Sequence, residues 1–487
     1  MALFKEGSEV NAAQLHDGFT PSRGQLLAMV VRLSLPVVIA ELCSTAMQYI
    51  DAAMVGSLGE VATASIGIVE STTWLVGGLC TAAATGFSVQ VAQLVGAARL
   101  AEARNVLRQS LLVLLGFGLA LMAACIALSD PLPRWLGAEP DVLPGATAYL
   151  WIFALGLPFV QINRTCVNML QCSGDMRTPS ALNVLMCVLD VVFNLMFIFP
   201  TRTATVLGVD VTLWGAGLGV AGAAVGTVLA EAVVALLMLW ATCVRSPTLR
   251  IFGKGSAALA GTGTQTARWK PTARCLAAAA RISAPIALER VLINGAQVVS
   301  TGIVAPLGTT AVAANSLAVT AESLCYMPGF GIGSAATTLV GQSIGANRRD
   351  LTRRFARTSV ALGMAVMTVM GVLMYLLAPA MLALLTPVAA VQVLGTQVLR
   401  IEAFAEPLFG AAIVCAGALR GAGDTLVPSL INLATMWGIR ITAAALLAPR
   451  VGLAGVWLAM CVELCVRGSL FLVRLLRERW LARARVV

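Results

Sequence analysis

Charged side chains are scarce in this chain of 487 residues: they make up 11% of the sequence, whereas hydrophobic residues make up 59%. A soluble globular protein carries about 25% charged residues. With a mean hydropathy of +0.88, the chain has too little charge to cover a soluble surface of its size. The composition therefore excludes a soluble protein and indicates an integral membrane protein.

Histidine is almost absent as well, because His16 is the only one. This excludes histidine-based metal sites and imidazole proton relays within the membrane. The twelve cysteines form no CxxC motif and lie mostly in apolar stretches, which predicts buried thiols. No GxxxxGK[ST] motif is present, which argues against ATP hydrolysis by this chain. We expect no enzyme, no catalytic residue and no cofactor.

Long apolar runs dominate what is present. Because a spanning helix needs about 20 mostly apolar residues, the sequence predicts twelve spans: 26–50, 62–90, 106–128, 145–168, 180–200, 214–243, 278–301, 311–340, 357–378, 391–416, 427–448 and 452–475. We expect an N-terminal cytoplasmic tail (1–25), two six-helix bundles (26–243 and 278–476), a cytoplasmic linker between them (244–277) and a basic cytoplasmic tail (477–487).

Positive charge follows one side of these spans. Of the 33 lysine and arginine residues, 25 fall in segments on the side of the N-terminus and four on the other side. Such a bias marks the cytoplasmic side, so we predict a multi-pass protein of the inner (plasma) membrane with both termini in the cytoplasm. It also explains the net charge of +10 without a nucleic-acid partner.

The two halves repeat each other at an offset of 249 residues. RLSLP at 32–36 matches RISAP at 281–285, and QLVGAAR at 93–99 matches QSIGANR at 342–348. An even number of spans per repeat gives parallel repeats, related by a pseudo-two-fold axis along the membrane normal. The predicted fold class is thus all-α, with twelve transmembrane helices in two parallel six-helix bundles. A cleft between such bundles favours a transporter that works by alternating access.

Five segments carry a family resemblance: IDAAMVGSLG (50–59), AQLVGAAR (92–99), IVAPLGTTAVAANSLA (303–318), YMPGFGIGSAATTLVGQSIGA (326–346) and LRGAGDT (419–425). In this set the chain resembles the MATE (multidrug and toxic compound extrusion) family. The resemblance implies an efflux antiporter that exports drugs and other amphipathic, often cationic, organic compounds in exchange for H⁺ or Na⁺. We expect the protein to be a monomer in contact with membrane lipids.

Ionisable groups at membrane depth are costly, so each is a functional candidate. Two polar stripes at helical spacing stand out: Glu41, Ser44, Gln48 and Asp51 in the first span, and Asn183, Cys187, Asp190 and Asn194 in the fifth. Their repeat counterparts are not acidic. We predict an ion-coupling site in the N-terminal bundle, formed by Gln48, Asp51, Asn183, Asp190 and Asn194.

The resemblance supports this site in part. Asp51 matches the first-span aspartate of MATE transporters, and Asp190 matches a second aspartate that the DinF-type branch keeps in the fifth span. That branch usually has an asparagine one turn before this aspartate, where the present chain has Met186. The NorM-type branch keeps a glutamate and an aspartate where this chain has Ile293 and Phe409. These departures favour H⁺ as the coupling ion. Binding of Na⁺ near Asp51 and Asp190 remains the alternative.

Other polar residues are candidates for the substrate cavity: Glu70, Glu289, Asn294, Gln297 and Glu322. Pro36 could serve as a hinge of the first span, or could simply occupy the first turns of its helix. Two alternatives stay open. One is a flippase for lipid-linked oligosaccharides or lipids, whose cavity should be richer in cationic residues, and the other, less favoured, is a membrane-embedded enzyme.

Overall fold

Helices make up most of the computed structural model, which we describe over residues 20–206, 209–252 and 268–483. The N-terminal half contains α2 (Arg23–Gly56), α3 (Glu60–Gly96), α4 (Leu100–Leu128), α5 (Pro131–Trp135), α6 (Leu143–Ser173), α7 (Arg177–Phe197), β1 (Pro200–Val206), β2 (Val209–Ala216), α8 (Gly219–Trp240) and η2 (Ala241–Arg245). Most of the predicted N-terminal tail, the middle of the predicted linker and the last four residues of the predicted C-terminal tail lie outside the described residues.

The C-terminal half begins at α9 and ends in a short helix after the last span. Its elements are α9 (Ala273–Val304), η3 (Ala305–Leu307), α10 (Thr309–Gly345), α11 (Arg349–Leu385), α12 (Ala389–Glu402), α13 (Glu406–Gly421), α14 (Leu426–Thr435), η4 (Met436–Ile441), α15 (Thr442–Val451), α16 (Leu453–Leu476) and α17 (Arg479–Arg483).

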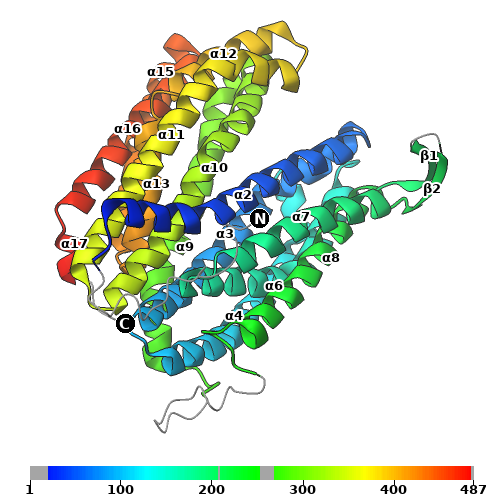
Figure 1. The fold of residues 1–487 in the computed structure, drawn as a ribbon. Coiled ribbons are helices and arrows are strands. Elements are labelled where there is room, and N and C mark those ends of the chain that lie inside the picture. The colour runs from blue at the N-terminus through cyan, green and yellow to red at the C-terminus, as the bar shows by residue number, and fades with distance from the viewer. Residues whose placement is uncertain (1–19, 207–208, 253–267, 484–487) are drawn as a thin grey trace.

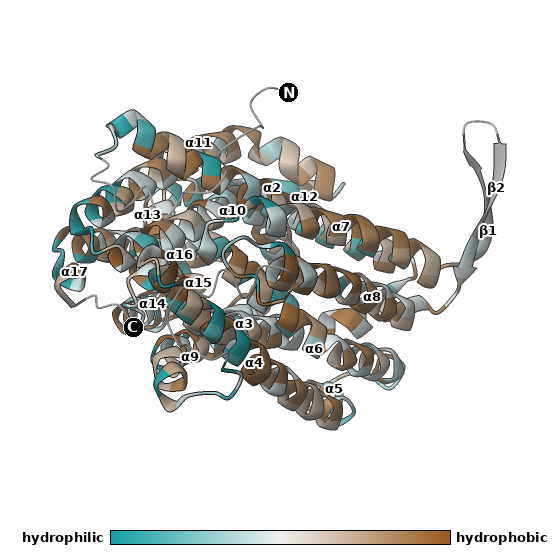
Figure 2. Cartoon of the chain, turned by 60° about the horizontal axis from the view of Figure 1, so that its bottom comes forward, coloured by the Kyte–Doolittle hydropathy of each residue, from teal (hydrophilic) through white to brown (hydrophobic). Residues whose placement is uncertain are grey.

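Six helical segments in each half correspond to the twelve predicted spans. This count takes α8 with η2, α12 with α13, and α14 with η4 and α15 as one segment each, and it leaves out the short helices α5, η3 and α17. In the described part of the chain, nine helices are long and apolar enough to cross a membrane by length and composition. Figure 2 shows hydrophobic residues covering the shafts of α4, α6, α7 and α8.

Two features depart from the prediction of an uninterrupted all-α chain. An antiparallel hairpin of β1 and β2 connects α7 to α8, so residues 214–216 belong to β2 and not to the sixth span. Threonine and valine are frequent in both strands, and these β-branched residues favour extended structure. The tenth span is broken between α12 and α13, where a single helix was predicted.

The backbone repeats its unusual conformations at the offset found in the sequence. Ala98 and Asn347, which follow the ends of α3 and α10, have φ angles of 57° and 55°. Gly59 and Gly308 have φ angles of 108° and 98°. Left-handed conformations are uncommon for residues other than glycine, so their recurrence 249 residues apart shows that the two halves share one backbone design.

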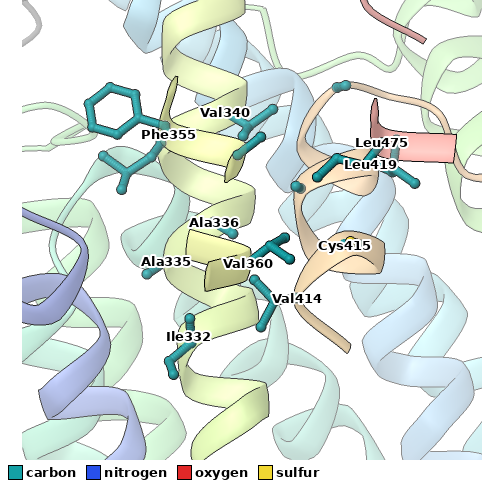
Figure 3. Packing of buried hydrophobic residues seen from close by; sticks show 14 of the residues in the cluster. Ile332, Ala335, Ala336, Val340, Phe355, Val360, Val414, Cys415, Leu419 and Leu475 are labelled. Atoms are coloured by element: carbon teal, nitrogen blue, oxygen red, sulfur yellow. The ribbon is translucent and has the colours of Figure 1, made fainter. Parts of the chain in front are cut away.

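The first helix of each half packs against the other half. The start of α2, with Leu26, Val30 and Leu33, belongs to the hydrophobic core that α10, α11 and α13 form, part of which Figure 3 shows. In the same way α9 lies against α3, where a Cβ atom at Gly86 would stand 2.1 Å from the Ser283 hydroxyl oxygen. Figure 1 shows the two halves diverging from the ends where α3 and α10 finish towards the ends that carry the β hairpin and α12.

Two aspartates related by the repeat, Asp175 and Asp424, have different partners. Asp175 accepts hydrogen bonds from the backbone N–H groups of Arg177 and Thr178, as expected for a residue that caps α7. Its repeat counterpart Asp424 pairs instead with Arg474, at 2.6 Å. Arg467 is partly buried on α16, 3.1 Å from the fully buried Glu463.

Candidate functional site

Asp51 on α2 and Asp190 on α7 meet at the side chain of Asn194. The Asn194 amide nitrogen donates to Asp51 Oδ1 at 2.9 Å and to Asp190 Oδ2 at 3.0 Å. Because a side-chain amide carries two N–H groups, one asparagine holds both carboxyl groups. Asp190 and Asn194 are one turn apart on α7, which explains how a single helix presents both to α2.

Burial differs between the two acids. Asp190 and Asn194 are each 1% exposed, whereas Asp51 is half-buried. The neighbouring helix α8 keeps Asn194 in place, because a Cβ atom at Gly226 would stand 2.2 Å from Asn194 Oδ1. Asp51 is therefore the more accessible member of the pair, and Asp190 the more enclosed one.

No described ion pair includes Asp51 or Asp190. Asp190 Oδ1 and Asn194 Oδ1 are buried and have no hydrogen-bond partner among the described residues. Two neighbouring carboxyl groups without a cationic partner are costly to ionise together in a medium of low dielectric constant. The arrangement can therefore bind a proton, or a small cation that accepts oxygen ligands.

Gln48 and Asn183, which were also predicted for this site, lie outside its described hydrogen-bonded group. Gln48 is exposed and Asn183 is partly exposed, and no described hydrogen bond links either side chain to Asp51 or Asp190. The structure thus brings together three of the five residues of the predicted ion-coupling set. It describes no cluster of three or more histidine, cysteine, aspartate or glutamate residues that could hold a metal ion.

A second group of buried acids lies in the C-terminal half. Glu322 on α10 is 7% exposed, while Glu402 at the end of α12 and Glu406 at the start of α13 are fully buried. Neither Glu402 nor Glu406 has a hydrogen-bond donor among the described residues. Sequence reasoning did not select Glu402, although an acid inside a predicted span is itself a signal.

Glu289 has local partners instead of facing open space. Its carboxylate accepts hydrogen bonds from Ser429 Oγ at 2.6 Å and from Asn432 Nδ2 at 2.7 Å, both on α14. Arg420 lies 3.9 Å away. These hydrogen bonds connect α9 to α14. Holding the two helices together is therefore an alternative to the predicted role of Glu289 in the substrate cavity.

The remaining cavity candidates are Glu70 on α3 and Asn294 and Gln297 on α9. Glu70 is exposed on α3 and accepts a hydrogen bond from Trp74 at 3.4 Å. Asn294 donates to the Arg290 carbonyl one turn earlier on α9, and Gln297 is exposed on the same helix. No described hydrogen bond joins these three side chains to one another.

Pro36 lies inside α2, more than three turns after Arg23. The alternative that it occupies the first turns of the helix is therefore wrong. It lies between the start of α2 and the turn that carries Asp51, and α2 contacts the C-terminal half on both sides of it, through Leu33 before it and Tyr49 after it. This position suits a hinge, since proline removes a backbone hydrogen bond.

Comparisons with known proteins agree with the fold. The MatE family model matches residues 36–196 and 285–446. The chain is 25% identical over 458 residues to the "Probable multidrug resistance protein NorM" of Thermotoga maritima, covering 93% of both chains. It is 26% identical over 468 residues to the "Multidrug resistance protein MdtK" of Edwardsiella ictaluri, covering 93% of this chain and 95% of that one.

Solved structures share the architecture. A structure described as the outward-facing conformation of a multidrug resistance MATE family transporter matches with a TM-score of 0.85 and 20% identity, over 98% of this chain and 99% of that one. A MATE structure in the straight conformation matches with a TM-score of 0.84 and 20% identity, over 97% and 99% of the two chains. The predicted twelve-helix fold class is confirmed, with the β hairpin as an addition.

Proposed function

The chain belongs to the MatE family, because the family model matches most of both halves, and from this premise we propose that it exports amphipathic, often cationic, organic compounds from the cell. Membership confirms the expectation of a membrane transporter rather than an enzyme. Relatives over nearly the whole chain are named as multidrug resistance proteins, which supports drugs as the substrate class.

We further propose that export is driven by protons entering through Asp51 and Asp190. When neither carboxyl group carries a proton, their negative charge attracts an organic cation. When a proton binds, that attraction weakens and the cation is released. The observation that supports this proposal is the shared Asn194 donor, which holds the two acids 2.9 and 3.0 Å from one nitrogen with no described cation beside them.

The different exposure of the acids gives a direction to the proton path. Half-buried Asp51 receives the proton first, and enclosed Asp190 receives it next, because both carboxyl groups share the Asn194 amide. A bend of α2 at Pro36 would then move Asp51 relative to α7. This motion links proton binding to the opening and closing of the bundles, as alternating access requires.

The proposed setting is the inner membrane, with both termini in the cytoplasm, a monomeric chain and the domain boundaries given above. It rests on the charge bias of the sequence and on the α-helical spans. In this orientation the bundles converge on the cytoplasmic side and diverge on the outer side (Figure 1).

Drug susceptibility of cells that overexpress the protein tests the export proposal. We expect resistance to ethidium or to fluoroquinolones, and we expect Asp51→Asn to abolish it at equal protein abundance. Unchanged susceptibility together with altered surface glycans would support the flippase instead and overturn the proposal.

A further inference from the structure

Two glutamines related by the repeat reach across the boundary between the halves. Gln342 on α10 donates from Nε2 to the backbone carbonyl of Cys172 on α6, at 3.0 Å. Gln93 on α3 donates from Nε2 to the backbone carbonyl of Gly421 on α13, at 3.3 Å. Both glutamine side chains are fully buried, and donors and acceptors alike are 249 residues apart.

The two acceptors belong to the last turns of their helices. Helix α6 ends at Ser173 and α13 ends at Gly421. The last four carbonyl groups of a helix have no intrahelical partner, and such groups are costly to bury without a donor. Each glutamine therefore satisfies a helix end of the opposite half, and it can do so only while the halves stay together.

Close backbone contact surrounds these hydrogen bonds. A Cβ atom at Gly96 would stand 2.0 Å from the Gln342 carbonyl oxygen, and one at Gly345 would stand 1.9 Å from the Gln93 carbonyl oxygen. Only glycine permits this approach of α3 to α10, because backbone atoms cannot move aside as a flexible side chain can. The contact lies where α3 and α10 end, on the proposed cytoplasmic side (Figure 1).

We propose that Gln93 and Gln342 are positioning residues of a two-fold related gate that closes the cytoplasmic side of the transporter. The inference rests on the proposed alternating access, for which it names the residues that must separate. When the halves part, water replaces each glutamine as the partner of its carbonyl group, so the gate opens without leaving a polar group unsatisfied. Two modest hydrogen bonds thus favour closure while keeping it reversible.

The solvent exposure of a native cysteine, Cys172, should indicate whether this gate is open or closed. Cys172 is 5% exposed, and its thiol faces the hydroxyl groups of Ser88 on α3 and Thr338 on α10. Thr338 also donates to the Gln171 carbonyl across the same boundary, at 2.9 Å. Separation of α10 from α6 would expose this thiol to the cytoplasm.

The test is the labelling rate of Cys172 by a membrane-impermeant maleimide in inside-out vesicles, measured by mass spectrometry of the peptide that contains it. We expect Gln93→Met and Gln342→Met each to raise the rate by about 2- to 10-fold, the factor that corresponds to one net hydrogen bond. Gln161→Met is the matched control, since Gln161 is also fully buried and donates to a carbonyl group, that of Cys80, within its own half.

Unchanged labelling of Cys172 in both glutamine variants, or an equal rise in Gln161→Met, would overturn the gate. Should a glutamine variant fail to fold, Gly345→Ala replaces it, because its Cβ atom meets backbone across the boundary. Gly116→Ala, with nothing within 4 Å, is then the control. Labelling does not require transport, so the gate can be decided even if Asp51→Asn shows that the export proposal is wrong.

Discussion

Asp51 and Asp190, on different helices of the N-terminal half, accept hydrogen bonds from the same nitrogen atom, Nδ2 of Asn194. A carboxyl pair held by one donor responds as a unit, because a change of charge on either acid alters the field at the other. The pair therefore provides a place where proton binding and cation binding can exclude each other.

Replacing Asp51 by asparagine should reduce drug resistance to that of cells lacking the protein. The substitution keeps the size of the side chain but removes the charge and the site of protonation. Minimum inhibitory concentrations, with protein abundance in the membrane measured in parallel, check this. Asp130→Asn is the control, since Asp130 is exposed and pairs only with Arg134 in the described structure. Full resistance in Asp51→Asn would remove Asp51 from the mechanism.

Gly226→Ala should impair export without touching an acidic residue. The new methyl group would meet Asn194 Oδ1 and displace the amide that joins the two carboxyl groups, and such overpacking costs about 1–3 kcal/mol. Ethidium efflux and the midpoint of thermal unfolding in detergent are the measurements. Gly116→Ala should change neither quantity appreciably. Normal efflux in Gly226→Ala would contradict the role given to Asn194.

Glu289→Ala should act mainly on stability. Ser429 and Asn432 would lose their shared acceptor, which is expected to cost about 1–3 kcal/mol. Glu289→Gln retains one acceptor oxygen and should lower the unfolding midpoint less. If both variants unfold normally but alter which drugs are exported, Glu289 belongs to the substrate cavity after all.

Glu402→Gln should raise the unfolding midpoint and leave export in place. Glu402 is buried beside Glu322 and has no described donor, so an amide removes one of the crowded acids and supplies a hydrogen-bond donor. Differential scanning fluorimetry and ethidium efflux check both parts. Loss of efflux comparable to that of Asp51→Asn would move the coupling site to the C-terminal half.

The sequence predicted the parts of this structure that depend on residue type and spacing. Hydropathy identified the twelve segments, and the helical spacing of polar residues grouped Asp51, Asp190 and Asn194, which hydrogen bonds join in the structure. The constant offset of 249 residues predicted the repeat, which the paired φ angles of Ala98 and Asn347 confirm.

Contacts between distant helices were less accessible to sequence reasoning. Glu289 was predicted to line a cavity, because nothing in its own helix indicates that Ser429 and Asn432 lie against it. The break before Glu406 was missed since the surrounding residues are apolar and hydropathy does not register a local change of backbone direction. The β hairpin did have a local signal in its threonine and valine residues.

The most direct test of proton coupling is efflux from proteoliposomes that contain the purified protein, with an imposed pH gradient and no sodium. We predict that the gradient alone drives ethidium transport, that a pH-sensitive dye records opposite proton movement, and that Asp51→Asn and Asp190→Asn abolish both signals. A strict requirement for sodium, or proton-driven transport that survives both substitutions, would contradict the account.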